Sequence, residues 1–351
     1  MSNAFCSLSN MGLRPFFQQQ LSIEEPIKET PVRVIGHQGE WLTIRDENSH
    51  YQIKLPGKWQ LRPQEEQPLI GDWLVMDSTG QPIRILDRIS SLSRRSSGHG
   101  QHTQYMAANI DTLFVVSSCN KNFKLSRIER YLALAFEGGA QPVVILTKAD
   151  LTDEPEHYCQ EVQRLHDNVV AISLDARSID GCKQLMPWVS PGDTVAFLGS
   201  SGVGKSTLIN SLLEQEVQST QPSRDQDDKG RHTTTVRSMV QMKGGAWLID
   251  TPGMRELRLG ESNQGLREVF SDIEELALQC QYRDCNHENT SGCAVMAEVN
   301  AERVDARRLN KYLKLQREQG YLKESQWQQR DRNRKFSKMV NQVKKIKYGK
   351  R

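Results

Sequence analysis

Residues 199–207 read Gly199-Ser200-Ser201-Gly202-Val203-Gly204-Lys205-Ser206-Thr207. They fit the pattern GxxxxGK[ST] of phosphate-binding loops, and they stand between a strand pattern at 195–198 and a helical pattern at 204–213. Glycines let backbone N–H groups surround phosphates, and the amino end of the helix adds a favourable dipole. In such a loop Lys205 contacts the terminal phosphates and the Ser206 hydroxyl binds Mg²⁺. We therefore expect a nucleoside triphosphate site in an α/β fold.

A second motif, Thr147-Lys148-Ala149-Asp150, also follows an apolar strand pattern and resembles the [NT]KxD motif of GTPases. In that motif the carboxylate accepts hydrogen bonds from the N1 and exocyclic amino groups of guanine, and the lysine stem covers the ring. Ser173, at the end of the next strand pattern, fits the weaker third guanine loop. Thr147 stands where asparagine is commonest. We do not expect one hydroxyl to make both contacts of that asparagine, one to the base and one to the phosphate loop.

A third motif, Asp250-Thr251-Pro252-Gly253, closes the strand pattern at 246–249. Its spacing from the phosphate loop favours Asp250 in the metal shell and the Gly253 N–H near the γ-phosphate. Before it, residues 230–235 read GRHTTT at the end of a polar loop, which is typical of a switch segment that orders around γ-phosphate and Mg²⁺. One threonine of this segment should bind the metal, and we assign that role to Thr234.

Met254 stands where many GTPases have a glutamine that orients the attacking water. A methionine makes no such hydrogen bond, so we expect slow intrinsic hydrolysis. His232 lies in the switch segment and is a candidate to orient water, although a solvated loop histidine explains it equally well.

The order of these motifs is unusual, because the base motif precedes the phosphate loop in the chain. In ordinary GTPases it follows, so the sequence resembles a circularly permuted GTPase. Apolar runs that alternate with helical patterns between 112 and 249 predict a mostly parallel sheet, and we expect this domain to span 103–260. The chain leaves the third motif directly into the C-terminal region, so we expect the nucleotide state to set the orientation of that region.

Residues 30–90 contain short strand patterns separated by turn signals, which predicts a small barrel of the OB type. Its aromatic residues could stack nucleotide bases, but core positions are favoured about two to one. They are Trp41, Tyr51, Trp59 and Trp73. Residues 1–29 are expected to be a flexible lead, and the polar stretch 90–104 a linker.

Three cysteines and a histidine crowd into fourteen residues of the helical C-terminal region, 261–351. They are Cys280, Cys285, His287 and Cys293. Three thiolates and one imidazole complete a tetrahedral zinc site and leave no open position, so a structural zinc ion is favoured over chance clustering.

The 351 residues carry a net charge of +3, which is unevenly distributed. Residues 323–351 hold eleven Lys or Arg against two acidic residues, so this tail has a charge of +9 and the rest of the chain −6. The basic tail indicates a polyanionic partner or simply a solvated tail. No apolar run reaches the roughly 18 residues of a membrane span, and residues 1–10 do not resemble a secretion signal. We expect a cytoplasmic protein with no membrane partner.

The ordered set of motifs closely resembles the ribosome small subunit-dependent GTPases, the bacterial small ribosomal subunit biogenesis factors. QYMAANID at 104–111 belongs to this set, and the likeness covers roughly residues 30–300. The resemblance implies an OB barrel, a permuted GTPase domain that binds GTP or GDP with Mg²⁺, and a helical domain with one zinc ion. It also implies binding to the small ribosomal subunit and its rRNA late in assembly, and GTP hydrolysis that the subunit stimulates. We expect the protein to be a monomer.

Two other functions stay open from the sequence. A P-loop kinase or ATPase would leave Asp150, the switch segment and the metal cluster without a role. A nucleic-acid-binding P-loop protein could hold a structural or ATP-linked nucleotide.

Overall fold

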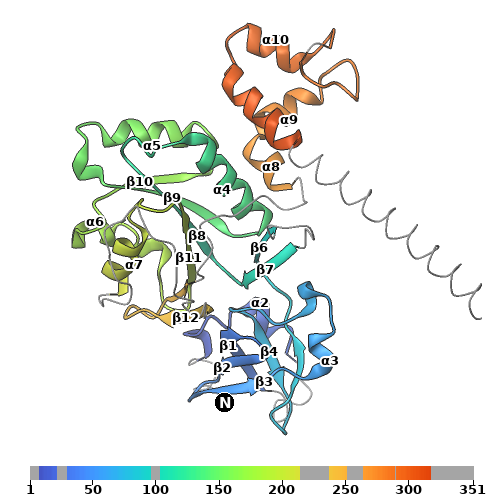
Figure 1. Ribbon diagram of the computed structural model, residues 1–351, viewed down its shortest axis with the longest axis vertical. Coiled ribbons are helices and arrows are strands. Elements are labelled where there is room, and N and C mark those ends of the chain that lie inside the picture. Colours follow the sequence, from blue (N-terminus) through green and yellow to red (C-terminus); the bar gives the residue numbers. More distant parts are fainter. Residues whose placement is uncertain are drawn as a thin grey trace, which may run out of the picture. The chain divides into compact units, whose positions relative to one another are not determined.

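The computed structural model describes residues 8–21, 30–95, 103–213, 237–250, 264–288 and 290–317 (Figure 1). The chain divides into two compact units, Met1–Gly260 and Glu261–Arg351. The expected domain boundaries stay predictions. Within the described ranges, no helix is both long and apolar enough to span a membrane.

Unit 1 is built on one continuous sheet with the order β10-β9-β8-β11-β13-β12-β1-β2-β3, to which β4 and β5 are attached beside β1. Strands β8 to β11 and β13 are parallel, whereas β12 and the N-terminal strands pair antiparallel. The N-terminal strands are β1 (Thr30–Gln38), β2 (Trp41–Arg45), β3 (His50–Lys54), β4 (Trp73–Met76) and β5 (Pro82–Ile85). The others are β8 (Thr112–Ser118), β9 (Gln141–Thr147), β10 (Val170–Ser173), β11 (Thr194–Gly199), β12 (Arg237–Gln241) and β13 (Trp247–Asp250).

Helices cover the parallel strands, as the alternating pattern predicts. They are α4 (Leu125–Glu137), α5 (Pro155–Gln163), α6 (Ile179–Lys183) and α7 (Lys205–Leu213). Phe114 of β8 and Phe197 of the neighbouring β11 belong to the same buried core as Leu208 of α7. The centres of the two phenylalanine rings lie 5.0 Å apart. Because successive strand residues face opposite sides, the intervening apolar residues face α4 and α5. The sheet is therefore apolar on both faces, as a parallel sheet must be.

The parallel strands all direct their carboxyl ends to the same end of the sheet. β9 ends at Thr147, β10 at Ser173, β11 at Gly199 and β13 at Asp250. Loops that follow parallel strands form the usual ligand crevice of such folds. The base motif after β9 and the phosphate loop after β11 therefore lie at the same end of the sheet.

The N-terminal strands enclose their own core, which includes Val34, Ile44 and Trp59 of the short helix α3 (Gly57–Gln60). Their order is β3-β2-β1-β4-β5, and within the described residues no ladder joins β3 to β5, so the closed barrel stays a prediction. Trp59 and Trp73 are fully buried, whereas Trp41 and Tyr51 are 49% and 39% exposed. The core interpretation is therefore right for two of the four aromatic residues.

Residues 90–104, expected to be a linker, contribute to a pair of antiparallel strands. These are β6 (Ser91–Arg95) and β7 (Thr103–Ala108). Gly138 and Gly139 at the end of α4 pack closely on this segment, because a Cβ at Gly138 would lie 2.9 Å from the Ser91 carbonyl oxygen.

Residues 8–21 correct the expectation of a flexible lead. The segment contains the short helix α2 (Pro15–Gln18), and Leu8, Met11, Leu13 and Phe17 are buried. Gly12 has φ +90°, and a Cβ there would lie 2.7 Å from the Gly192 carbonyl oxygen, so only glycine permits this approach. The segment is thus a packed part of unit 1.

Polar contacts join the same segment to the parallel strands. Arg14 forms ion pairs with Asp111, at 2.7 Å, and with Asp193, at 2.5 Å. Trp247 Nε1 donates to the Asn10 carbonyl oxygen at 3.2 Å. Arg33 of β1 is buried and donates to the Met11 carbonyl oxygen and, at 2.6 Å, to Thr194 Oγ1. Burial lowers the pKa of Arg33 to about 10, so the side chain stays charged at neutral pH.

Unit 2 is helical. It contains α8 (Gln264–Val269), α9 (Ser271–Ala277), α10 (Ala294–Asn300) and a helical stretch at 306–317. The buried rings of Phe270 and Tyr312 lie 5.5 Å apart, and the Arg308 guanidinium lies 4.8 Å from the centre of the Phe270 ring. Arg308 also pairs with Asp272 through two hydrogen bonds of 2.9 Å, which join the 306–317 helix to α9.

Adjacent phenylalanines test the packing of residues 8–21. Phe17 is buried with its ring 6.2 Å from that of Trp73, whereas Phe16 is 44% exposed. We expect Phe17→Ala to lower the free energy of unfolding of unit 1 by about 3 kcal/mol, because a large buried ring is lost. Phe16→Ala is the matched control and should cost less than about 1 kcal/mol. Equal effects in thermal or denaturant unfolding would contradict this packing.

Candidate nucleotide site and metal centre

The phosphate loop turns from β11 into α7 through three glycines with different constraints. A Cβ at Gly199 would lie 2.3 Å from the Val116 carbonyl oxygen, and Gly202 and Gly204 have φ of +77° and +90°. Lys205, the first residue of α7, donates from Nζ to the Gly199 carbonyl oxygen at 2.7 Å and to that of Ser200. The lysine ammonium therefore lies inside the curve of the loop, where the terminal phosphates of a nucleotide would need it.

Thr147 joins the base motif to this loop. It is fully buried, and Oγ1 lies within hydrogen-bond distance of the Val203 carbonyl oxygen and 3.1 Å from that of Ser117. Its Oγ1 would also lie 3.2 Å from a Cβ at Gly204. Of the two asparagine contacts considered for this position, the threonine hydroxyl therefore makes the one to the phosphate loop.

Lys148 reinforces the same connection. Its backbone is left-handed, with φ +61°, and its Nζ donates to the Gly202 carbonyl oxygen at 2.9 Å. The side chain thus runs from the end of β9 towards the phosphate loop, which is the course that a lysine stem needs to cover a base held at Asp150.

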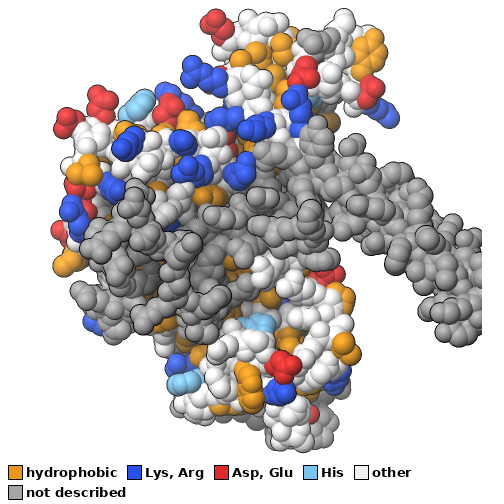
Figure 2. Space-filling view, viewed as in Figure 1, with side chains coloured by type: hydrophobic (Ala, Val, Ile, Leu, Met, Phe, Trp, Pro, Cys, Tyr) orange, Lys and Arg blue, Asp and Glu red, His pale blue; other side chains and the backbone are white. Residues whose placement is uncertain are grey.

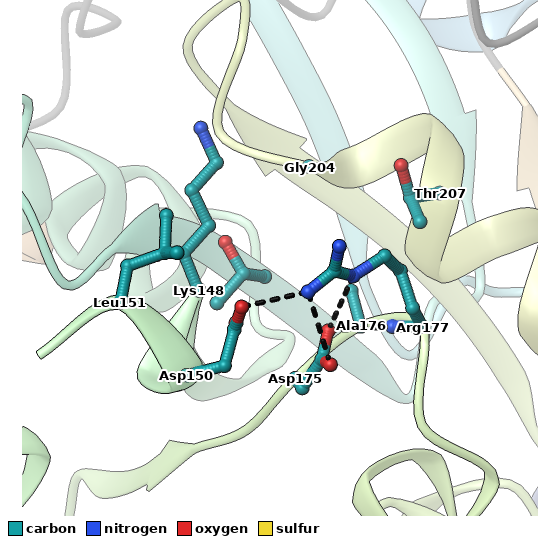
Figure 3. Close-up of a pocket in the computed structure, with 9 residues that line it drawn as sticks. Lys148, Asp150, Leu151, Asp175, Ala176, Arg177, Gly204 and Thr207 are labelled. Carbon is teal, nitrogen blue, oxygen red and sulfur yellow. Dashed lines mark hydrogen bonds and ion pairs between the residues drawn. The ribbon is translucent and has the colours of Figure 1, made fainter.

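A pocket of about 200 Å³ lies between the base motif and α7 (Figure 3). It is lined by Thr147, Lys148, Asp150, Leu151, Asp175, Ala176, Arg177, Gly204 and Thr207. Residues from the base motif and the phosphate loop therefore share one cavity.

Arg177 connects two carboxylates of this pocket. Its Nη2 donates to Asp150 Oδ2 at 2.7 Å, and its Nε and backbone N–H donate to Asp175 Oδ1 at 3.1 and 3.0 Å. The hydrogen bond with Arg177 lowers the pKa of Asp175, and the same bond raises the pKa of Arg177. Both residues are charged at neutral pH.

Ser173 does not line the pocket, and the residues that follow it do. Ser173 is the last residue of β10 and is absent from the lining, whereas Asp175, Ala176 and Arg177 reach the cavity. Ser178 is a sequence signal that could have located these residues, because serine is a common helix N-cap. Its Oγ accepts from the Gly181 N–H at the start of α6, so the residues between β10 and Ser178 form the turn.

The remaining predicted residues lie at the same end of the sheet or outside the described part of the chain. Ser206 and Thr207 form the first turn of α7, and Asp250 is the last residue of β13. Thr234, His232 and Gly253 lie outside the described residues, as do Met254 and the basic tail.

The four metal-ligand candidates of unit 2 converge on one point. The ligand atoms of Cys280, Cys285, His287 and Cys293 all lie within 4.8 Å of one another. Cys280 Sγ lies 3.9 Å from Cys293 Sγ, and the two sulfurs lie 3.6 and 3.5 Å from His287 Nδ1. A zinc tetrahedron with Zn–S bonds of about 2.3 Å and Zn–N bonds of about 2.0 Å has edges of roughly 3.5 to 3.8 Å. The donor set and its spacing fit one zinc ion.

The backbone holds these ligands in place. His287 has φ +55°, and Cys293 is the N-cap of α10, where its Sγ accepts from the Met296 N–H. Burial raises the pKa of the Cys293 thiol to about 11, so a thiolate there requires a compensating cation.

Comparison with known proteins gives consistent matches. A profile described as RsgA GTPase matches residues 85–260. The small ribosomal subunit biogenesis GTPase RsgA 2 of Vibrio vulnificus is 43% identical over 340 residues, which cover 96% of this chain and 95% of the relative. The small ribosomal subunit biogenesis GTPase RsgA of Methanosarcina acetivorans is 45% identical over 255 residues, which cover 71% and 69%.

Two solved structures share the fold. YjeQ of Thermotoga maritima aligns with a TM-score of 0.61 and 24% identity, covering 83% of this chain and 98% of that one. YloQ, described as a circularly permuted GTPase, aligns with a TM-score of 0.58 and 22% identity, covering 86% and 98%. The strand order of unit 1 is therefore that of a circularly permuted GTPase fold.

The buried hydroxyl of Thr147 provides a test of the link between the two loops. We expect Thr147→Val, which keeps the shape and removes the donor, to lower the free energy of unfolding by about 1 to 3 kcal/mol, because carbonyl oxygens are left unpaired. GDP affinity, measured by calorimetry, should fall as well because the phosphate loop loses a support. Thr147→Ser retains the hydroxyl and should keep most of both quantities. Unchanged GDP affinity in Thr147→Val would contradict the link.

Proposed function

The chain belongs to the RsgA GTPase family, and on this premise we propose that it uses GTP hydrolysis to assist the late maturation of the small ribosomal subunit. The observation that carries the proposal is the shared pocket, in which Asp150 lies with Gly204 and Thr207. A carboxylate that accepts two parallel N–H donors selects guanine, and adenine has no such pair on that edge. The names of the relatives supply the ribosomal part of the proposal.

We assign the phosphate chemistry to the phosphate loop and its neighbours. Lys205 binds the β- and γ-phosphates, and backbone N–H groups of 199–206 hold the remaining oxygens. Ser206, Thr234 and Asp250 would hold Mg²⁺, whose charge stabilises the leaving diphosphate. Water attacks the γ-phosphorus, the bond to the bridging oxygen breaks, and GDP and phosphate leave.

The residues near the phosphate loop are consistent with a hydrolysis rate that depends on the small subunit. Met254 provides no hydrogen bond to water, and we propose His232 as the residue of this chain that orients it. On α4, Arg127 donates to Ser200 Oγ of the phosphate loop at 2.7 Å. Figure 2 shows Lys and Arg side chains gathered over this part of unit 1, and the basic residues before and within α4 include Lys121, Lys124 and Arg130. We propose that rRNA contacts this surface and thereby acts on the phosphate loop.

We further propose that the N-terminal strands form an OB-type barrel and that unit 2 is a domain stabilised by one zinc ion. Exposed Trp41 and Tyr51 on β2 and β3 favour RNA stacking for the barrel. The zinc ion would cross-link the loop 280–293 to α10 and stabilise a unit with a small core. A monomeric, cytoplasmic protein fits this role. A nucleic-acid-binding protein with a structural or ATP-linked nucleotide is not favoured, because it gives Asp150 no role.

The proposal predicts a subunit-dependent reaction at this one site. Purified small subunits should raise phosphate release from GTP by about tenfold or more. Asp150→Asn should lose about 10- to 100-fold in GTP affinity, because charged hydrogen bonds are lost, and should accept xanthosine triphosphate instead. Phosphate release that small subunits leave unchanged, or that Asp150→Asn leaves unchanged with GTP, would overturn the proposal. The nucleotide switch in the variant excludes a contaminating hydrolase.

The metal proposal predicts one zinc ion per chain by atomic emission. Cys285→Ser should lose the metal and make unit 2 sensitive to limited proteolysis, because the 280–293 loop loses its cross-link. Cys182→Ala, which removes a buried thiol of unit 1, is the control and should keep the zinc. Equal zinc content in the two variants would contradict the assignment.

A further inference from the structure

Arg177 uses the same carboxylate that guanine recognition requires. Its Nη2 donates to Asp150 Oδ2 at 2.7 Å, and the residues that line the pocket around this pair come from the base motif and Leu151, the turn after β10, the phosphate loop and α7 (Figure 3). The ion pair therefore spans the pocket that would receive the base.

A guanidinium resembles the guanine edge in the feature that a carboxylate recognises. Both groups are planar and present N–H donors side by side. A base that donates from N1 and from its amino group needs both oxygens of Asp150, and one of them accepts from Arg177. Arg177 and guanine thus compete for an acceptor and for the same space.

The ion pair between Arg177 and Asp150 is weak enough for an entering ligand to break it. The Arg177 side chain is 68% exposed, whereas those of Asp150 and Asp175 are each 29% exposed. An exposed ion pair is weak and is screened by salt. The contacts of Arg177 with Asp175, through Nε and the backbone N–H, hold the arginine beside the pocket after it leaves Asp150.

We propose that Arg177 is an internal competitor of the guanine base, which holds Asp150 until the entering nucleotide displaces it. The inference rests on the proposed function, because it requires Asp150 to bind guanine. Arg177 then slows nucleotide entry without contributing to the stability of the bound state. A residue that contacts the bound base would instead slow nucleotide release.

Stopped-flow measurement with a fluorescent GDP analogue separates these roles. We expect Arg177→Gln to raise the association rate constant about two- to sixfold, because an exposed ion pair of ordinary strength leaves Asp150 open only about one half to one sixth of the time. The dissociation rate constant should stay unchanged. The ratio between variant and wild type should approach one at about 1 M salt, where screening weakens the pair. Because the Arg177 side chain is exposed, we expect the variant to fold as wild type does, and equal unfolding temperatures of the two proteins verify this.

Two controls define the origin of the effect. Arg164→Gln removes another exposed arginine, which pairs with Glu161 at 2.6 Å outside the pocket, and should leave the association rate unchanged. Inorganic pyrophosphate needs only the phosphate loop, so its affinity should be equal in wild type and Arg177→Gln.

The outcomes are distinct. Faster association with unchanged dissociation supports the proposal. Faster dissociation of the analogue from Arg177→Gln, or rate constants equal to those of wild type, would overturn it while leaving the base site intact. Failure of wild-type protein to bind the GDP analogue would instead remove the proposed function on which it rests.

Discussion

The ladder between β8 and β11 is the contact on which the site depends. Five residue pairs, from Val195 with Thr112 to Gly199 with Val116, join the base half of the sheet to the phosphate half. Backbone hydrogen bonds between two strands require that the strands lie side by side in space, whether or not they are adjacent in the sequence. A chain that begins with the base half therefore builds the same crevice as one that ends with it. The close approach of β11 to β8 also requires glycine at position 199, because any side chain there would meet the Val116 carbonyl oxygen.

The parts of the fold that local signals determine could be predicted from the sequence. The alternating patterns between 112 and 249 predict strands that alternate with helices, and the phosphate loop lies between the expected strand and helix. Residues 8–21 could not be predicted in this way. Their order depends on Asp111, Asp193 and Trp247, which lie about 100 to 240 positions away, and a Gln- and Ser-rich composition carries no trace of such partners.

The site shows the same division. The sequence predicted that Asp150 and the phosphate loop meet, and the pocket that they share agrees with it. The sequence motif placed the third guanine loop at Ser173, whereas residues 175–177 line the pocket. Strand ends predicted from sequence are uncertain by a few residues, and the turn after the strand decides which side chains face the cavity. On β2, Trp41 faces outward because Leu42 and Ile44 occupy the inward positions of the alternation.

The pairing of β1 with β12 has a consequence for shortened forms of this protein. Gly36 and His37 pair with Ser238 and Arg237 of β12, so β1 covers part of the edge of β12 that faces away from β13. A chain trimmed to the family match at 85–260 would keep β12 and lose its cover. Unpaired N–H and C=O groups on such a strand recruit other chains, and aggregation follows. β1 therefore protects the edge of β12 from pairing with other chains. An isolated GTPase domain needs β1, or a substitution that prevents such pairing at the edge of β12.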